Sequence, residues 1–246
     1  MIQRPIIVVN YRFAILSMTD LEHNIAQLNL RIHQACSAAS RKPDDITLLA
    51  VSKTRDTQTI RQAYHSGLLR FGENYASEAA EKIPFLPDDI EWHFIGPVQS
   101  NKTAFIASHF TWVQTVDRMR IARRLNDQRP AHLPPLHCLI QVNISDDPDK
   151  SGVTPEEVEP LAKEILLLPR ITLRGLMTIP KAGLSPDQLA ADFARMAQLL
   201  RQLQAIAPLA DTLSMGMSDD LEIAIANGTT MVRVGTDLFG PRAAKQ

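Results

Sequence analysis

The segment ITLLAVSKTRDTQTIRQAYHSGLLRFGE, residues 46–73, shows the pattern that decides the fold. Apolar and β-branched residues dominate 46–53 and return at 69–73, and each run has the length of a buried strand. Between them, residues 57–66 place apolar side chains at helical spacing. The segment therefore predicts a strand, a helix and a second strand, which is the repeating unit of a parallel α/β fold.

The same alternation continues along the chain. It predicts eight strands, at 46–53, 69–73, 91–96, 111–116, 136–145, 171–180, 211–217 and 231–239. Helical patterns lie between them at 57–66, 75–83, 103–108, 118–127, 155–168, 186–207 and 219–227. Eight such units in about 200 residues favour a single-domain (β/α)8 TIM barrel. An open doubly wound sheet is the alternative, but no dinucleotide-type glycine fingerprint follows the first strand.

Composition excludes several classes of protein. The 246 residues are 45% hydrophobic and carry 26 basic and 27 acidic side chains. This balance argues against a disordered chain and against nucleic-acid binding through a basic surface. No run reaches the roughly 20 apolar residues of a membrane span. Cys36 and Cys138 form neither a disulfide framework nor a metal cluster, so we expect a cytoplasmic protein.

The first 17 residues form an apolar amino-terminal segment. Arg12 interrupts the apolar run in residues 1–17, which argues against a signal peptide. Thr19 can cap a helix whose apolar positions are Leu21, Ile25, Leu28 and Ile32. We expect residues 1–17 to be an extension or a misassigned start, and residues 18–246 to be the barrel with an extra N-terminal helix.

Two charged residues occupy strand positions that are normally apolar. Active sites of such barrels form at the carboxyl ends of the strands, where Lys53 ends the first predicted strand. Burial lowers the pKa of a lysine, and its neutral amine can form a Schiff base; a solvated loop lysine is the alternative. Arg233, on the same face of the last strand as Met231, needs either a carboxylate or a ligand as its partner.

The loops after strands seven and eight have the features of a phosphate site. Barrels often bind phosphate there, at a helix N-terminus. Gly216 and Gly235 allow backbone N–H groups to approach an anion. Ser218 could instead cap the next helix, and Asp219 and Asp220 would compete with a phosphate. Hydroxyl donors are available from Ser214, Ser218 and Thr236.

Strands one and eight are neighbours in a closed barrel, so Lys53 and the phosphate loops face the same opening. An aldehyde that carries a phosphate fits this arrangement. Pyridoxal 5′-phosphate (PLP) is the obvious candidate.

Six segments of the chain, from about residue 18 to residue 241, resemble the pyridoxal phosphate homeostasis proteins. These are LLAVSKT around Lys53, FGENYASE at 71–78, WHFIGPVQSNK at 92–102, GLMTIP at 175–180, LSMGMSDDLEIAI at 213–225 and TMVRVGTDLFG at 230–240. The resemblance implies a barrel of the alanine racemase type, PLP fold type III. It implies an aldimine between PLP and Lys53, with Arg233 facing the pyridine nitrogen and Asn74 near the cofactor. It places the phosphate at Ser214, Gly216, Met217, Ser218, Gly235 and Thr236.

The resemblance also bears on catalysis. An arginine has no lone pair to accept a proton, so Arg233 would keep the ring nitrogen unprotonated and the electron sink weak. In alanine racemases a tyrosine from an additional C-terminal domain of the partner subunit supplies a second acid/base. We expect no room for that domain here, and Tyr75 is the one candidate substitute. We therefore expect a monomeric PLP-binding protein without strong catalysis.

Such a protein would store or buffer PLP, or deliver it to apo-enzymes in transient contacts, with no nucleic acid and no membrane as partners. An amino-acid racemase or a weak PLP-dependent lyase is the alternative. A phosphosugar aldolase that uses Lys53 is a third and less favoured one. A further hypothesis is that Lys150, in the loop at 146–152, holds PLP transiently during transfer.

Overall fold

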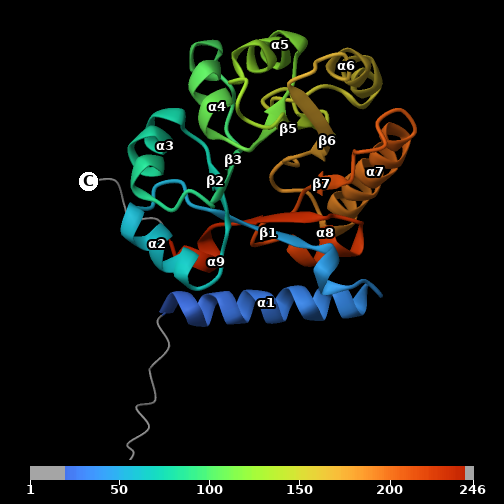
Figure 1. Cartoon of the computed structure of the whole chain (residues 1–246). Helices are drawn as coiled ribbons and strands as arrows, with labels where there is room; N and C mark the ends of the chain where they lie inside the picture. Colours follow the sequence, from blue (N-terminus) through green and yellow to red (C-terminus); the bar gives the residue numbers. More distant parts are fainter. Residues whose placement is uncertain (1–19, 242–246) are drawn as a thin grey trace, which may run out of the picture.

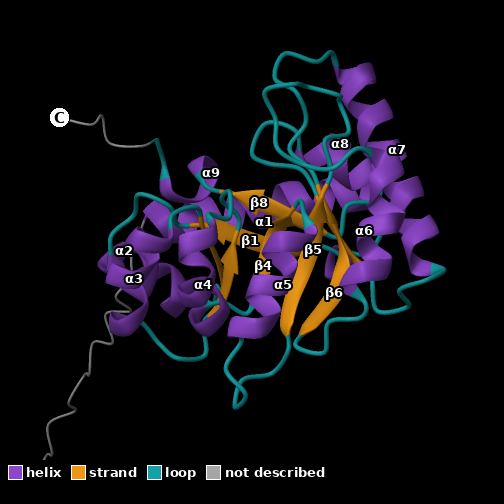
Figure 2. Ribbon diagram, turned by 90° about the horizontal axis from the view of Figure 1, so that it is seen from above, coloured by secondary structure: helices purple, strands orange, loops and turns teal. Residues whose placement is uncertain are grey.

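Eight parallel strands close into a barrel in chain order, from β1 next to β2 through to β8 next to β1. The computed structural model describes residues 20–241, so the expected extension at 1–17 and the cap at Thr19 lie outside the described residues. The expected TIM barrel is confirmed, and Figure 2 shows its strands inside a ring of helices. The strands are β1 (Thr47–Val51), β2 (Arg70–Glu73), β3 (Glu91–Phe94), β4 (Trp112–Val116), β5 (Leu136–Gln141), β6 (Ile171–Met177), β7 (Thr212–Ser214) and β8 (Met231–Val234).

Helices cover the outside of this barrel (Figure 1). They are α1 (Asp20–Ala38), α2 (Thr57–His65), α3 (Ala76–Lys82), α4 (Thr103–His109), α5 (Met119–Gln128), α6 (Val158–Ile165), α7 (Pro186–Gln204), α8 (Leu221–Ala226) and α9 (Thr236–Phe239). The extra helix α1 packs against both α8 and α9. Within residues 20–241, no helix combines the length and the apolar character needed to cross a bilayer.

The alternation of side chains along each strand divides the apolar residues between two regions. Leu49, Val51, Ile95 and Met231 form a cluster inside the barrel, whereas Ala50 belongs to the larger core between the strands and the helices. This is the pattern expected where alternate residues face the interior of a closed sheet. Because Leu49 lies opposite Arg233 in the pairing of β1 with β8, the arginine also faces the interior.

The predicted strand at 231–239 was too long. Strand β8 ends at Val234, and Thr236–Phe239 forms the short helix α9, in which the Phe239 N–H donates to the Gly235 carbonyl at 2.9 Å. Leu238 of this helix is fully buried in the core that α1 covers. Tertiary packing therefore overrides the strand-like composition of this segment.

Several other predicted boundaries were also wrong: β5 ends at Gln141 rather than at residue 145, and β6 at Met177 rather than at residue 180. Three more differences lie next to the expected site. Strand β7 is limited to Thr212–Ser214, because the chain turns at Gly216 with a φ of +93°. Lys53 does not end β1 but lies in the turn two residues beyond Val51. Helix α8 begins at Leu221 rather than at residue 219.

Candidate cofactor site

Lys53 lies in the turn between β1 and α2, and the side chain is half-buried. The next residue, Thr54, has a φ of +65°, which a residue with a branched side chain adopts only when its surroundings enforce it. The neighbouring turn after β2 carries Asn74 and the exposed Tyr75. The structure therefore brings Lys53 and Asn74 to the same end of the barrel, above adjacent strands.

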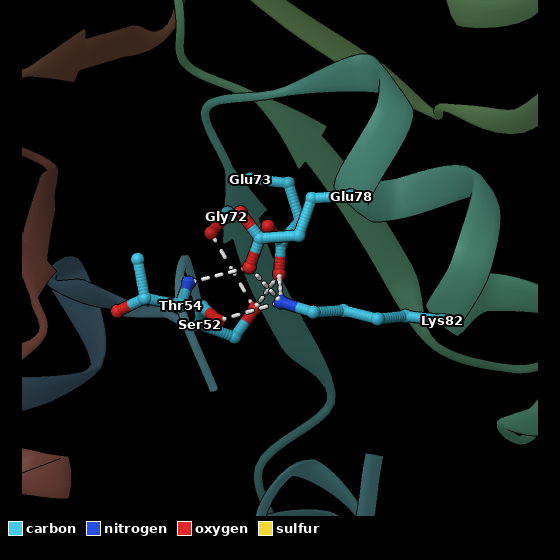
Figure 3. A network of polar contacts seen from close by, with 6 residues as sticks. All are labelled: Ser52, Thr54, Gly72, Glu73, Glu78 and Lys82. Atoms are coloured by element: carbon cyan, nitrogen blue, oxygen red, sulfur yellow. Dashed lines mark hydrogen bonds and ion pairs between the residues drawn. The ribbon is translucent and has the colours of Figure 1, made fainter. Parts of the chain in front are cut away.

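A buried cluster of charges fixes the turn that carries Lys53 (Figure 3). The Lys82 ammonium donates to the Ser52 carbonyl at 3.0 Å, to Glu73 Oε1 at 2.9 Å and to Glu78 Oε1 at 2.5 Å. The Thr54 N–H donates to the same Glu78 oxygen at 2.5 Å. The peptide groups on both sides of Lys53 are therefore held by charged side chains, which explains the φ of Thr54.

The cluster places a buried lysine next to a buried carboxylate. The Lys82 side chain is 7% exposed and that of Glu73 is fully buried. Burial raises the pKa of Glu73 in spite of the opposing effects of Lys82 and of the Ser52 hydroxyl, which donates to Glu73 at 2.6 Å. A buried ion pair is most sensitive to the loss of one partner, because the other then remains as an uncompensated charge.

Asn74 presents an unsatisfied acceptor at this site. Its Oδ1 atom is buried and has no hydrogen-bond partner within residues 20–241. Its backbone is packed closely, since a Cβ atom on Gly96 would lie 1.9 Å from the Asn74 carbonyl oxygen. A buried polar atom without a partner is rare in native proteins, so this oxygen is available to accept a hydrogen bond from a bound molecule.

Arg233 is 4% exposed and is held by three hydrogen bonds inside the barrel. Nη1 donates to the carbonyl and to the hydroxyl of Ser214, both at 2.8 Å, and Nη2 donates to the Thr178 carbonyl at 2.8 Å. Burial lowers the pKa of Arg233 to about 10, so the side chain is still cationic near neutral pH. No acceptor among the described residues takes the Nε hydrogen or the second Nη2 hydrogen, which leaves two donors for a ligand.

The predicted phosphate loops follow β7 and β8, and the structure explains why each of them contains a glycine. Gly216 has a φ of +93°, and a Cβ atom there would lie 2.5 Å from Cβ of Ala224 in α8. Gly235 lies against β1, where a Cβ atom would meet the Val51 carbonyl at 3.3 Å. Among the predicted hydroxyls, Thr236 is exposed and Ser218 is half-buried.

Two of the predicted phosphate ligands have partners within the protein. The Ser214 hydroxyl is buried between Arg233 and Gln114, so this side chain supports the arginine. The loops after β7 and β8 are together called the cradle. The Met217 N–H donates to Asp220 Oδ1 at 2.5 Å, so this carboxylate occupies one of the N–H donors of the cradle. Burial raises the pKa of Asp220 in spite of the hydrogen bond from Met217.

Helix α1 connects the two halves of the cradle through one side chain. Arg31 pairs with Glu222 of α8 at 2.9 Å and with Asp237 of α9 at 2.5 Å. It also donates to the Ser218 carbonyl at 3.0 Å. The loop after β7 and the helix after β8 are therefore fastened to the same residue.

Sequence reasoning missed the residues that act through other residues. Lys82, Glu78, Gln114 and Arg31 touch the predicted site residues or their backbone, yet none was selected. A signal exists for Gln114, a polar residue in the otherwise apolar strand run WVQTV. Lys150, which the sequence had singled out, is half-buried in the loop after β5, where its N–H donates to the Asp147 carbonyl at 3.0 Å.

Comparison with known proteins identifies relatives of this chain over most of its length. The alanine racemase N-terminal domain family matches residues 17–243. The pyridoxal phosphate homeostasis protein of Escherichia coli strain K12 is 49% identical over 237 residues, covering 92% of this chain and 98% of that protein. The protein of that name from Pseudomonas aeruginosa is 51% identical over 226 residues, covering 92% and 97%.

Solved structures extend the comparison. PipY from Synechococcus elongatus, in the form with PLP bound, is 34% identical with a TM-score of 0.77, covering 89% of this chain and all of that one. Alanine racemase from Corynebacterium glutamicum has a TM-score of 0.62 at 18% identity, covering 92% of this chain and 62% of that one, and shares the fold alone. This chain belongs to the pyridoxal phosphate homeostasis protein family, whose barrel is that of the alanine racemase N-terminal domain.

Proposed function

We propose that this protein binds PLP and serves PLP homeostasis by holding, buffering or delivering the cofactor. The observation that carries the proposal is the pairing of β1 with β8. It sets the turn of Lys53 beside a strand that bears the buried Arg233 and ends in the glycine cradle. The names of the relatives and the PLP-bound PipY structure support the same ligand.

The donor set fits PLP group by group. The finer proposal is that the Lys53 amine binds the aldehyde as a Schiff base, while Gly216, Gly235 and Thr236 surround the phosphate. The two remaining donors of Arg233 suit an unprotonated pyridine nitrogen, which accepts a hydrogen bond. The buried Asn74 oxygen, which lacks a partner among residues 20–241, suits a donor on the ligand, such as a ring hydroxyl. PLP would supply an electron sink, and these contacts would keep it weak.

We infer that the protein has no strong catalytic activity. Arg233 cannot take up a proton, and its described contacts are two carbonyls and one hydroxyl, without a carboxylate. Tyr75, the residue considered as a second acid/base, is 56% exposed, which is poorly suited to a protected proton transfer. We further propose that the protein acts as a monomer in transient contact with apo-enzymes. The unpaired, buried Cys36 and Cys138 suit the cytoplasm.

Covalent trapping tests the proposed binding mode. The purified full chain should take up PLP, turn yellow, lose that absorbance with borohydride, and gain a pyridoxyl mass on Lys53. Lys150→Ala is the matched control and should bind as the unsubstituted protein does, whereas Lys53→Ala should lose the label. A colourless protein that takes up no added PLP would refute the proposal.

Two further measurements test the role. Racemisation and α,β-elimination should be orders of magnitude slower than the roughly 1–1000 per second typical of enzymes. Turnover within that range would favour the racemase or lyase alternative. A pyridoxyl adduct on Lys150 in the Lys53→Ala variant would support a transfer role for Lys150, and its absence would remove that hypothesis.

A further inference from the structure

A chain of four hydrogen bonds crosses the barrel interior from Arg233 to Glu91. Arg233 Nη1 donates to Ser214 Oγ at 2.8 Å, and that hydroxyl lies 2.7 Å from Gln114 Oε1. Gln114 Nε2 lies 2.9 Å from His93 Nδ1, and His93 Nε2 lies 2.9 Å from Glu91 Oε1. The chain passes from β8 to β7, across the barrel to β4, and on to β3.

The two ends of this chain lie in different surroundings. Ser214, Gln114 and His93 are fully buried, and Arg233 nearly so. Glu91 is one-third exposed and lines a hollow of about 590 Å³ at the opposite end of the barrel. That hollow includes the first residues of six strands, namely Thr47, Arg70, Glu91, Trp112, Thr212 and Met231. The chain therefore connects the cofactor end of the barrel with its amino-terminal end.

The chemistry of its members gives the chain one direction. A guanidinium can only donate, so the Ser214 oxygen accepts from Arg233 and its own hydrogen is directed to the Gln114 carbonyl. The Gln114 amide must then present its NH₂ group to His93 Nδ1. That nitrogen is an acceptor, so the neutral ring carries its hydrogen on Nε2 and donates it to Glu91.

The opposite orientation of Gln114 is disfavoured on physical grounds. It would turn the carbonyl toward Nδ1 and require a hydrogen there. The ring would then be either a buried cation or a neutral ring whose Nε2 lone pair faces a carboxylate. Burial lowers the pKa of His93 in spite of Glu91, which disfavours the cation. Trp112 stacks on the ring at 5.1 Å and holds its plane.

We propose that Gln114 and His93 are positioning residues that fix the Ser214 hydroxyl as an acceptor for Arg233. The placement of the guanidinium at the cofactor then depends on a carboxylate at the other end of the barrel. The direction of the hydrogen-bond chain is inferred from the geometry, whereas its effect on the cofactor rests on the proposed PLP function.

The first test needs no ligand. Histidine ¹⁵N spectra of the cofactor-free full chain should show His93 as a neutral ring with its hydrogen on Nε2. In Gln114→Leu the Nδ1 resonance should move downfield, because that lone pair loses its donor. A ring protonated on Nδ1, or an Nδ1 resonance that does not move in Gln114→Leu, would overturn the proposal.

The second test follows the bound cofactor by its absorbance. Gln114→Leu should weaken PLP binding about fivefold, as expected for the loss of one net hydrogen bond, and shift the absorption band. Glu91→Gln should change both in the same direction by less. The matched control is Asp211→Asn, because Asp211 lines the same hollow and pairs with Arg174 but makes no described contact with the residues of the hydrogen-bond chain.

The outcomes separate the two proposals. A Gln114→Leu variant with an unchanged band and affinity would overturn the positioning role, as would equal effects of Glu91→Gln and Asp211→Asn. A purely structural role would lower the melting temperature without moving the band. If the unsubstituted protein takes up no PLP, the proposed function fails, while the ¹⁵N spectra still decide whether the chain has the stated direction.

Discussion

Replacing Lys82 with methionine would remove the cation from the buried cluster that holds the turn of Lys53. The methionine matches the apolar length of the lysine but leaves the Ser52 carbonyl without the Lys82 donor and the buried Glu73 carboxylate without its cation, with only the Ser52 hydroxyl still donating to it. Breaking a buried pair from one side costs about 3–5 kcal/mol. For a chain of this size, that loss corresponds to a fall of roughly 6–20 °C in the melting temperature.

Lys163→Met is the matched control for this prediction. Lys163 pairs with Glu159 at 2.7 Å with the same four-residue spacing as Lys82 and Glu78, but its side chain is 61% exposed. An exposed pair of this kind contributes about 0.3–0.5 kcal/mol. Thermal and urea unfolding of the two variants therefore compare the loss of a buried cation with the loss of an exposed one, and equal losses of stability would refute the reasoning.

The deficit of Lys82→Met should also depend on pH. Lys82 lowers the pKa of Glu73, so its loss raises the folded-state pKa of that carboxyl further above the unfolded value. A group with a raised folded-state pKa stabilises the fold when it is protonated, and this stabilisation is lost as the pH rises through that pKa. The variant should therefore be closer to the unsubstituted protein at about pH 5 than at about pH 8, with slower borohydride labelling of Lys53 at either pH.

Three more predictions follow from the site. Gly216→Ala should lower the free energy of unfolding by about 1–3 kcal/mol and weaken PLP binding, because the new Cβ meets a close contact at a residue with a positive φ. Gly67→Ala, which has the same φ but open space around it, should lose less stability in the same urea titration and leave PLP affinity unchanged. Arg31→Ala should lower PLP affinity in an absorbance titration, whereas Arg123→Ala, which removes an exposed ion pair, should not. Burial raises the pKa of Cys138 to about 12, so its thiol should react with a disulfide reagent only after unfolding; rapid reaction of the native protein would contradict the burial.

The site residues that the sequence singled out lie where one local rule is broken. Arg233 interrupts an apolar strand and Gly216 interrupts a strand-to-helix connection, so both are visible without knowledge of their neighbours. Lys82 gave no such signal, because a lysine near the end of an exposed-looking helix is ordinary, and only folding brings Ser52 and Glu73 to its amine. The strand prediction for residues 236–239 was wrong for a related reason. Their composition suits a strand, whereas their packing against α1 makes them a helix.

Helix α1 also has a consequence for the order of events during synthesis. Its Asn24 donates to the Leu238 carbonyl at 3.0 Å, a contact between residues 214 positions apart. Arg31 reaches Asp237 across 206 positions. Helix α1 is the first described helix to be synthesised, yet it can form these two contacts only after α9, the last one, has been synthesised. If the cofactor binds between these loops as proposed, its binding requires that the whole barrel has been translated and closed.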